Sequence, residues 1–130
     1  MNWKYVKNLQ EIDLINEFEK EFNCKLPDDF IKCVKNNNAG RPELNSFDTE
    51  VTSERTIKKL LSFNKNDSEN IWNANKILNK IQANIIAFAM DSFGNYICFD
   101  TKNTVVFFEH ETETMEIISD NFNSFLSKLK

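Results

Sequence analysis

The first stretch with helical periodicity covers residues 9–22. Apolar residues recur there in steps of three and four, which places them on one stripe of an amphipathic helix: Leu9, Ile12, Ile15, Phe18 and Phe22. Asn8 and Glu11 have the spacing of a capping box, so we expect the helix to begin beside them and to end near Asn23.

A second helix is expected to begin within the segment Leu26-Pro27-Asp28-Asp29-Phe30. Proline suits a first helical position because its missing N–H would have no partner there. The two acids that follow would interact favourably with the helix dipole. We expect Phe30, Cys33 and Val34 to face inward. The Asn-rich segment 36–42 should end the helix, since Asn and Gly tolerate left-handed backbone and Pro42 cannot continue a helix.

Two further helices are predicted. Residues 68–82 carry an apolar stripe made of Ile71, Ala74, Ile77, Leu78 and Ile81. Trp72 falls one residue off that stripe, so we expect it to be exposed. A last helix should run over residues 120–129 with Ser119 or Asp120 as its cap, and its inward face would carry Phe122, Phe125, Leu126 and Leu129.

The chain between residues 85 and 118 has the pattern of a β-meander, because short apolar runs alternate with polar turns. The expected strands are 85–89, 96–100, 104–110 and 115–118. Val105-Val106-Phe107-Phe108 is apolar at every position, which predicts a central strand covered on both faces. Residues 47–51 and 57–63 are two further candidate strands, and 64–67 is a polar turn.

These elements predict one domain over residues 1–130 in the α+β class. We expect a sheet of about 4–6 strands that is either mainly antiparallel or mixed. The N-terminal helices, a middle helix and a C-terminal helix would flank it. The composition, 41% hydrophobic and 28% charged, is that of a globular domain. Phe accounts for 12 residues, and because Phe has no polar group, most of these rings should be in the core.

The net charge of −4 argues against direct nucleic-acid binding and against docking on an anionic membrane. No apolar run reaches the roughly 20 residues of a membrane span. The first residues contain no apolar stretch like that of a signal peptide. Three cysteines, an odd and sparse set, fit a reducing compartment. We therefore expect a cytoplasmic protein.

The negative charge is concentrated in the β half. Residues 1–90 contain 13 acids and 13 bases, whereas residues 91–127 contain seven acids against Lys102 alone, a net charge of −6. Glu109, Glu111 and Glu113 alternate, so in an extended chain they would share one face. Two interpretations stay open. The acids could form a docking surface for a basic partner, or they could be solvated turn and edge residues that hinder strand aggregation.

On the first interpretation, the partner-binding residues would be the acids of the β half and one exposed aromatic, since interface hot spots favour Trp and Tyr. The candidates are Asp91, Glu109, Glu111, Glu113, Glu116 and Trp72. Trp3, Tyr5 and Tyr96 are further aromatic candidates. The expected state is a monomer or a weak homodimer.

Three segments together resemble the SUKH superfamily, also called the Smi/Knr type. They are Leu26–Phe30 with its Asn38-Ala39-Gly40-Arg41-Pro42 end, the run Ile85–Asp100 with its Asp91-Ser92-Phe93-Gly94-Asn95 turn, and Val105–Glu111 followed by the last helix. The family usually has an Asn-Gly-Gly turn after the second helix, and Ala39 replaces its first Gly here. The resemblance implies an α+β fold without catalysis or cofactors. In bacteria such proteins resemble immunity proteins that neutralise a toxin domain, often a nuclease, by stoichiometric binding.

Catalytic and metal chemistry have little support in the sequence. The candidate ligands Cys24, Cys33, Cys98 and His110 contain no close pair of the kind that zinc sites show, so we expect no metal. Cys98 and His110 lie on strands expected to be adjacent, but no Gly-rich loop beside Cys98 offers an oxyanion hole. We expect no catalytic residue and no enzyme activity. The alternative function is a regulatory or scaffold domain with an endogenous protein partner and no toxin.

Overall fold

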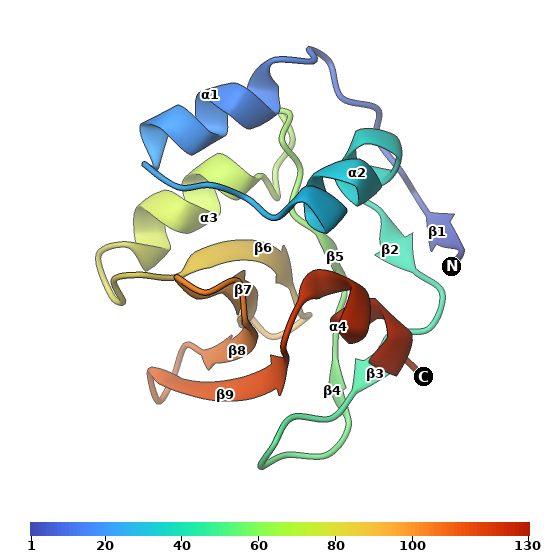
Figure 1. Ribbon diagram of the computed structural model, residues 1–130, viewed down its shortest axis with the longest axis vertical. Coiled ribbons are helices and arrows are strands. Elements are labelled where there is room, and N and C mark those ends of the chain that lie inside the picture. The colour runs from blue at the N-terminus through green and yellow to red at the C-terminus, as the bar shows by residue number, and fades with distance from the viewer.

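The computed structural model describes all residues from 1 to 130 and contains four helices and nine strands (Figure 1). Their order is β1 (Trp3–Lys4), α1 (Leu14–Glu21), α2 (Asp28–Asn37), β2 (Arg41–Pro42), β3 (Ser46–Phe47), β4 (Arg55–Thr56), β5 (Lys59–Leu60), α3 (Ile71–Leu78), β6 (Ile86–Met90), β7 (Tyr96–Phe99), β8 (Val105–Glu109), β9 (Thr114–Ser119) and α4 (Phe122–Lys128).

The main sheet is antiparallel, with the strand order β5-β6-β7-β8-β9. Neighbours in sequence are therefore neighbours in space, which confirms the predicted meander. Two separate two-stranded ladders, β1 with β2 and β3 with β4, are also antiparallel. One isolated parallel bridge joins Ser62 and Asn70. The α+β class and the mainly antiparallel sheet are confirmed.

Strand β8 has the buried position that its apolar run predicts. It pairs with β7 on one side and with β9 on the other. All four residues of Val105–Phe108 are buried, so both faces of this strand are covered.

Aromatic rings form the centre of the core. Ten of the twelve Phe side chains are buried. Phe88 and Phe99, from the adjacent strands β6 and β7, stack with ring centroids 4.2 Å apart. Phe30 of α2 lies within 5.4 Å of both rings and 5.3 Å from Phe122 of α4, so it joins two helices to the sheet. At the other end of the molecule α1 lies beside α3, where Phe18 meets Trp72 at 5.4 Å (Figure 1).

Helix α1 begins at Leu14, five residues later than predicted. The preceding segment is held in another conformation by Asn64, whose side-chain oxygen accepts from the N–H of Gln10 and whose amide donates to the C=O of Asn8. Asn8 therefore caps no helix, and Ile12 is exposed rather than on the inner stripe. The prediction failed because a side chain more than 50 residues away competes for these backbone groups.

Helix α3 is also shorter than predicted, and only Ile71, Ala74 and Leu78 of the predicted stripe are buried. Asn70 caps it by accepting from the N–H of Asn73 at 2.8 Å. Ile77 and Ile81 are exposed, whereas Trp72 is buried, so the prediction of an exposed Trp72 is wrong. The polar residue Asn75, which is not part of the predicted stripe, is also buried. It can be buried because its amide is fully bonded to backbone groups.

The connection after α2 depends on a buried asparagine. The side chain of Asn38 donates to the C=O of Lys7 and to the hydroxyl of Ser62, and accepts from the N–H of Phe63. Ala39, which stands where the SUKH family usually has Gly, adopts the left-handed conformation with φ of 63°. The turn therefore keeps the backbone that glycine would favour, although alanine pays a steric cost there.

The remaining boundaries differ modestly from the predictions. Pro27 is the N-cap of α2 rather than its first residue, while Asp28 and Asp29 lie in the first turn as expected. Asn121 caps α4 by accepting from the N–H of Ser124, in place of Ser119 or Asp120. The candidate strand 47–51 is mostly a loop, because the chain leaves β3 after Phe47 and returns only at β4.

Candidate protein-binding surface

The candidate acids lie around two turns of the sheet but have different roles. Asp91 directly follows β6 and is buried. Its carboxylate accepts hydrogen bonds from the N–H groups of Phe93 and Asn95 and from the amide of Asn95, at 2.8–2.9 Å. Asp91 thus shapes the β6–β7 turn and offers little surface to a partner.

Glu109 and Glu116 are bound by Arg55. The Nη2 atom of Arg55 lies 3.1 Å from Oε2 of Glu109 and 2.9 Å from Oε2 of Glu116, and its guanidinium carbon lies 4.3 Å from the ring centroid of Phe107. Thr49 and Thr52 donate to the Glu116 carboxylate. These contacts hold the loop between β3 and β4 against β8 and β9.

Partial burial of Glu116 would raise the pKa of its carboxyl, but the hydrogen bonds from Arg55, Thr49 and Thr52 outweigh this effect, and its pKa is lowered. The carboxylate is therefore ionised at neutral pH and largely neutralised by Arg55. Glu116 acts in this network rather than as a free surface charge.

Glu111 and Glu113 are exposed and make no ion pair. They lie in the turn over residues 110–113 between β8 and β9, where Glu113 has φ of 55°. The alternation of Glu109, Glu111 and Glu113 does not place them along one extended strand, so that expectation is wrong. The turn nevertheless projects two unpaired carboxylates into solvent.

Trp72 contacts none of these acids. It packs against Phe18 and Phe22, and its Nε1 donates to the C=O of Phe63 at 2.9 Å. Lys65 lies over its ring at 4.3 Å. The indole is part of the core between α1 and α3, and it is not available as an anchor for a partner.

A hollow of about 370 Å³ lies among the acids and is formed by three segments: the end of the β3–β4 loop with β4, the β6–β7 turn and the β8–β9 turn. We call it the acidic groove. Its lining contains four acids, one arginine and the only histidine: Thr52, Glu54, Arg55, Thr56, Asp91, Phe93, Asn95, Glu109, His110 and Glu111. With neutral His110 the lining has a net charge of −3, which complements a basic partner.

Phe93 is the aromatic residue of this groove, and 74% of its surface is exposed. Its backbone N–H is bonded to Asp91, so the turn that presents the ring is held in place. Phe93 is not among the candidates predicted from the sequence, although its place between Asp91 and Gly94 in a turn is a signal for exposure that outweighs its apolar character. An exposed aromatic beside acids is suited to contact an aliphatic or cationic side chain.

His110 is fixed by the same turn. The side-chain oxygen of Asn95 lies 2.8 Å from Nδ1 of His110 and also accepts the backbone N–H of His110, while the Asn95 amide donates to Asp91. An oxygen in this position requires the hydrogen of the neutral imidazole on Nδ1, which leaves Nε2 as an acceptor. With a neutral His110, the groove therefore presents Nε2 of the imidazole as a further acceptor beside the carboxylates.

The three cysteines are free thiols that differ in burial, with Cys98 fully inside the core. No group of three or more His, Cys, Asp or Glu side chains is arranged to hold a metal ion. Register pairs Cys98 with Val106, four residues before His110, which is about 13 Å along a strand. Burial raises the pKa of the Cys98 thiol strongly, so it stays protonated. Burial also raises the pKa of Cys24 and of Cys33 to about 11.

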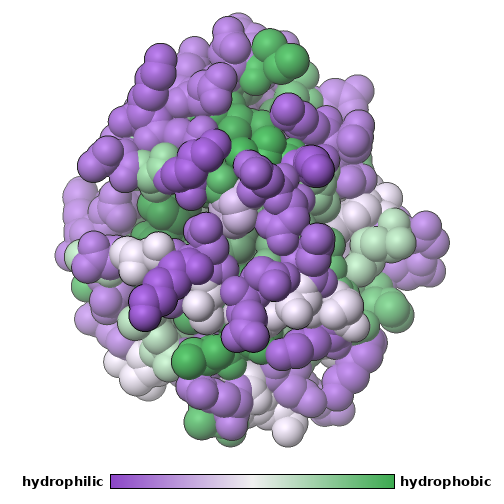
Figure 2. Space-filling view, viewed as in Figure 1, coloured by the Kyte–Doolittle hydropathy of each residue, from purple (hydrophilic) through white to green (hydrophobic).

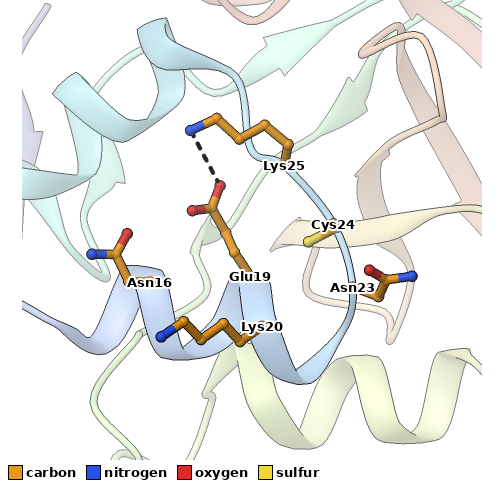
Figure 3. Close-up of a pocket in the computed structure, with 6 residues that line it drawn as sticks. All are labelled: Asn16, Glu19, Lys20, Asn23, Cys24 and Lys25. Carbon is orange, nitrogen blue, oxygen red and sulfur yellow. Dashed lines mark ion pairs between the residues drawn. The ribbon is translucent and has the colours of Figure 1, made fainter.

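Another hollow, of about 580 Å³, lies beside the end of α1 and is lined by polar side chains (Figure 3). The carboxylate of Glu19 accepts from the N–H of Leu26 at 2.7 Å and lies 3.8 Å from Nζ of Lys25. Glu19 thus fixes the connection between α1 and α2, and its bonds explain this cluster without a ligand.

On the face shown in Figure 2, hydrophobic surface occurs in small areas between hydrophilic side chains. Exposed large apolar residues include Tyr5, Val51, Phe93, Met115 and Ile117. None of the four helices has the length and apolar character needed to cross a membrane.

Comparison with curated proteins finds no match. A family model, SUKH_6, described as SMI1-KNR4 cell-wall, matches residues 12–126. The match includes both turns of the acidic groove and all four helices except the last residues of α4. The chain therefore belongs to the SUKH family.

Proposed function

We propose that this protein is an immunity-type protein that neutralises a toxin domain by stoichiometric binding in the cytoplasm. SUKH proteins are generally non-catalytic and of the immunity type, and the family match supports this class. The observation that carries the choice of surface is the acidic groove, where unpaired Glu111 and the exposed ring of Phe93 lie together.

The expected partner is a basic toxin domain, such as a nuclease whose substrate cleft is positively charged. An acidic surface attracts such a domain through long-range electrostatics, which accelerates association and selects against acidic partners. Phe93 would supply the apolar contact that slows dissociation, because buried aromatic anchors usually dominate interface energies. The protein itself needs no cofactor and performs no reaction in this mechanism.

The test is to search the adjacent genes for a toxin domain, to purify that domain, and to measure binding by calorimetry and toxin activity in the same buffer. We expect a one-to-one complex and loss of toxin activity at the same molar ratio. Binding without inhibition would favour a regulatory or scaffold role. The absence of any complex with the neighbouring toxin would reject the proposal.

A further inference from the structure

A second groove lies away from the acidic groove and shares no lining residue with it. We call it the amide groove. It has a volume of about 550 Å³ and is bounded by the α1–α2 connection, the segment from the end of α3 to the start of β6, and the β7–β8 turn. Its apolar lining comes from Phe22, Leu26, Ile85, Ile86 and Phe99.

Main-chain groups of two buried lining residues have no partner within the protein. Only 3% of Ile85 is exposed, and neither its N–H nor its C=O takes part in a hydrogen bond. Only 2% of Leu26 is exposed, and its C=O accepts no hydrogen bond, although its N–H is bonded to Glu19. Backbone groups of buried residues are nearly always paired. These groups therefore depend on a partner from outside the chain, which is either solvent or a ligand in the groove.

The polar lining of the amide groove is also free. Four asparagine side chains line it, and none of them makes a hydrogen bond within the protein. They are Asn23, Asn79, Asn84 and Asn103. Each amide offers both donors and an acceptor. The only lining charges are Lys25 and Asp100, one of each sign, so the groove favours an occupant without net charge.

We propose that the amide groove binds a short, extended, uncharged segment of a partner polypeptide. A peptide backbone supplies both donors and acceptors, and so it can pair with the free groups of Ile85 and Leu26 and with the asparagine amides. Its alternate side chains would lie on the apolar lining. This inference does not depend on the toxin or on the acidic groove.

The test uses the full ¹⁵N-labelled chain and the probe peptide acetyl-Ser-Leu-Ser-Leu-amide, which has no charge and has leucines at strand spacing. We expect saturable amide shifts confined to the lining of the amide groove, including Lys25, Asn84 and Ile85. The dissociation constant should be on the order of 1 mM, as suits a few hydrogen bonds and two leucine contacts. The same peptide N-methylated at both leucines should bind at least about 10-fold more weakly, because it cannot donate at those positions.

Two variants each add a large side chain to the lining of the groove. Thr101→Trp and Asn79→Trp are substitutions of exposed lining residues and should each abolish the shifts. Lys102→Trp is the matched control, because Lys102 is exposed in the same turn but does not line the groove, and it should leave binding unchanged. Water alone as the occupant would give no saturable shifts, and this result would overturn the proposal. Equal binding of the N-methylated peptide, or full binding by both blocking variants, would overturn it too.

Discussion

Asn75 of α3 pairs with both backbone groups of Ala87 in β6: its amide nitrogen lies 3.0 Å from the C=O oxygen, and its side-chain oxygen lies 2.8 Å from the N–H nitrogen. A strand edge would normally use these groups to bind another strand. The same amide also donates to the C=O of Ile71, so it is satisfied inside the core. One polar side chain thereby attaches a helix to the sheet.

Asn75→Leu should lower the free energy of unfolding by about 3 kcal/mol, because it leaves the N–H and C=O of Ala87 buried without partners. Urea denaturation measures the loss. The control is Asn73→Leu on the same helix, whose side chain is exposed, and we expect that change to have an effect within about 0.5 kcal/mol. Equal losses for the two variants would contradict the role given to Asn75.

Gly40→Ala should be strongly destabilising for a steric reason. A Cβ atom at Gly40 would lie 2.8 Å from the C=O oxygen of Asn37 and 3.1 Å from Cε3 of Trp3. Because the first of these contacts is with backbone at the end of α2, it cannot be relieved by a rotamer change. We expect a loss of about 2–4 kcal/mol in urea denaturation.

Gly94→Ala should be less destabilising than Gly40→Ala. Gly94 has φ of 87°, and the atoms nearest to a Cβ atom there belong to the side chain of His110, the first at 3.3 Å. The backbone penalty of about 1–2 kcal/mol should dominate its loss. A Gly40→Ala protein as stable as the wild type would show that the chain can shift at this turn.

Much of this fold could be predicted because its strongest elements are local. The meander from β6 to β9 follows from apolar runs separated by turns, and the apolar run of β8 correctly predicted burial on both faces. The start of α2 could also be predicted, since Pro27 and the two aspartates stabilise the helix terminus at which they lie. In these segments the deciding interactions connect residues close in sequence.

The failures have a common physical cause, which is that asparagine amides bind distant backbone. Asn64 bonds the backbone of residues 8 and 10 and so shortens α1, while Asn75 is buried in α3 and bonded to the backbone of Ala87. Because asparagine is polar, the pattern of apolar residues does not show that these side chains are buried. The pairing of Glu109 was hidden for a similar reason, because Arg55 lies more than 50 residues away in the sequence and binds it only in the folded chain.

The thiols should react slowly with iodoacetamide, and Cys98 should not react at all in the folded state. Burial raises the pKa of Cys98 strongly and raises the pKa of Cys24 to about 11, so neither is a thiolate at pH 8. Mass spectrometry of the alkylated protein measures this, with urea-unfolded protein as the control in which all three cysteines react. Rapid modification of Cys98 without unfolding would reopen the possibility of a nucleophile.

The Arg55–Glu116 pair should make the stability depend on pH. Its lowered folded pKa means that Glu116 stabilises the fold above the usual carboxyl pKa of about 4.3, and that this contribution is lost as the pH falls through the folded value. Glu116→Gln should lose about 1 kcal/mol at pH 7 and show a smaller further loss between pH 5 and pH 3. Urea denaturation across this range measures both. Parallel pH profiles for the variant and the wild type would contradict the assignment.

Substitutions in the acidic groove and at the adjacent Glu113 should separate the electrostatic and apolar contributions to binding of the toxin domain. Glu111→Lys combined with Glu113→Lys should reduce the association rate roughly 10-fold at low salt and weaken its salt dependence, because both carboxylates are exposed and unpaired. Phe93→Ala should instead raise the dissociation rate, by about 10-fold for an anchor worth roughly 1–2 kcal/mol. Stopped-flow and surface-binding kinetics measure the two rates.

Both sets of changes should leave the fold intact, since these side chains are exposed and outside the Arg55 network. The matched control for charge is Glu21→Lys at the end of α1, which is exposed and lies outside the acidic groove. It changes the net charge by two but should alter the association rate much less than the double change. If Glu21→Lys lowers the logarithm of the association rate by half as much as the double variant does, only the total charge of the protein attracts the partner. The acidic groove would then have no special part in docking.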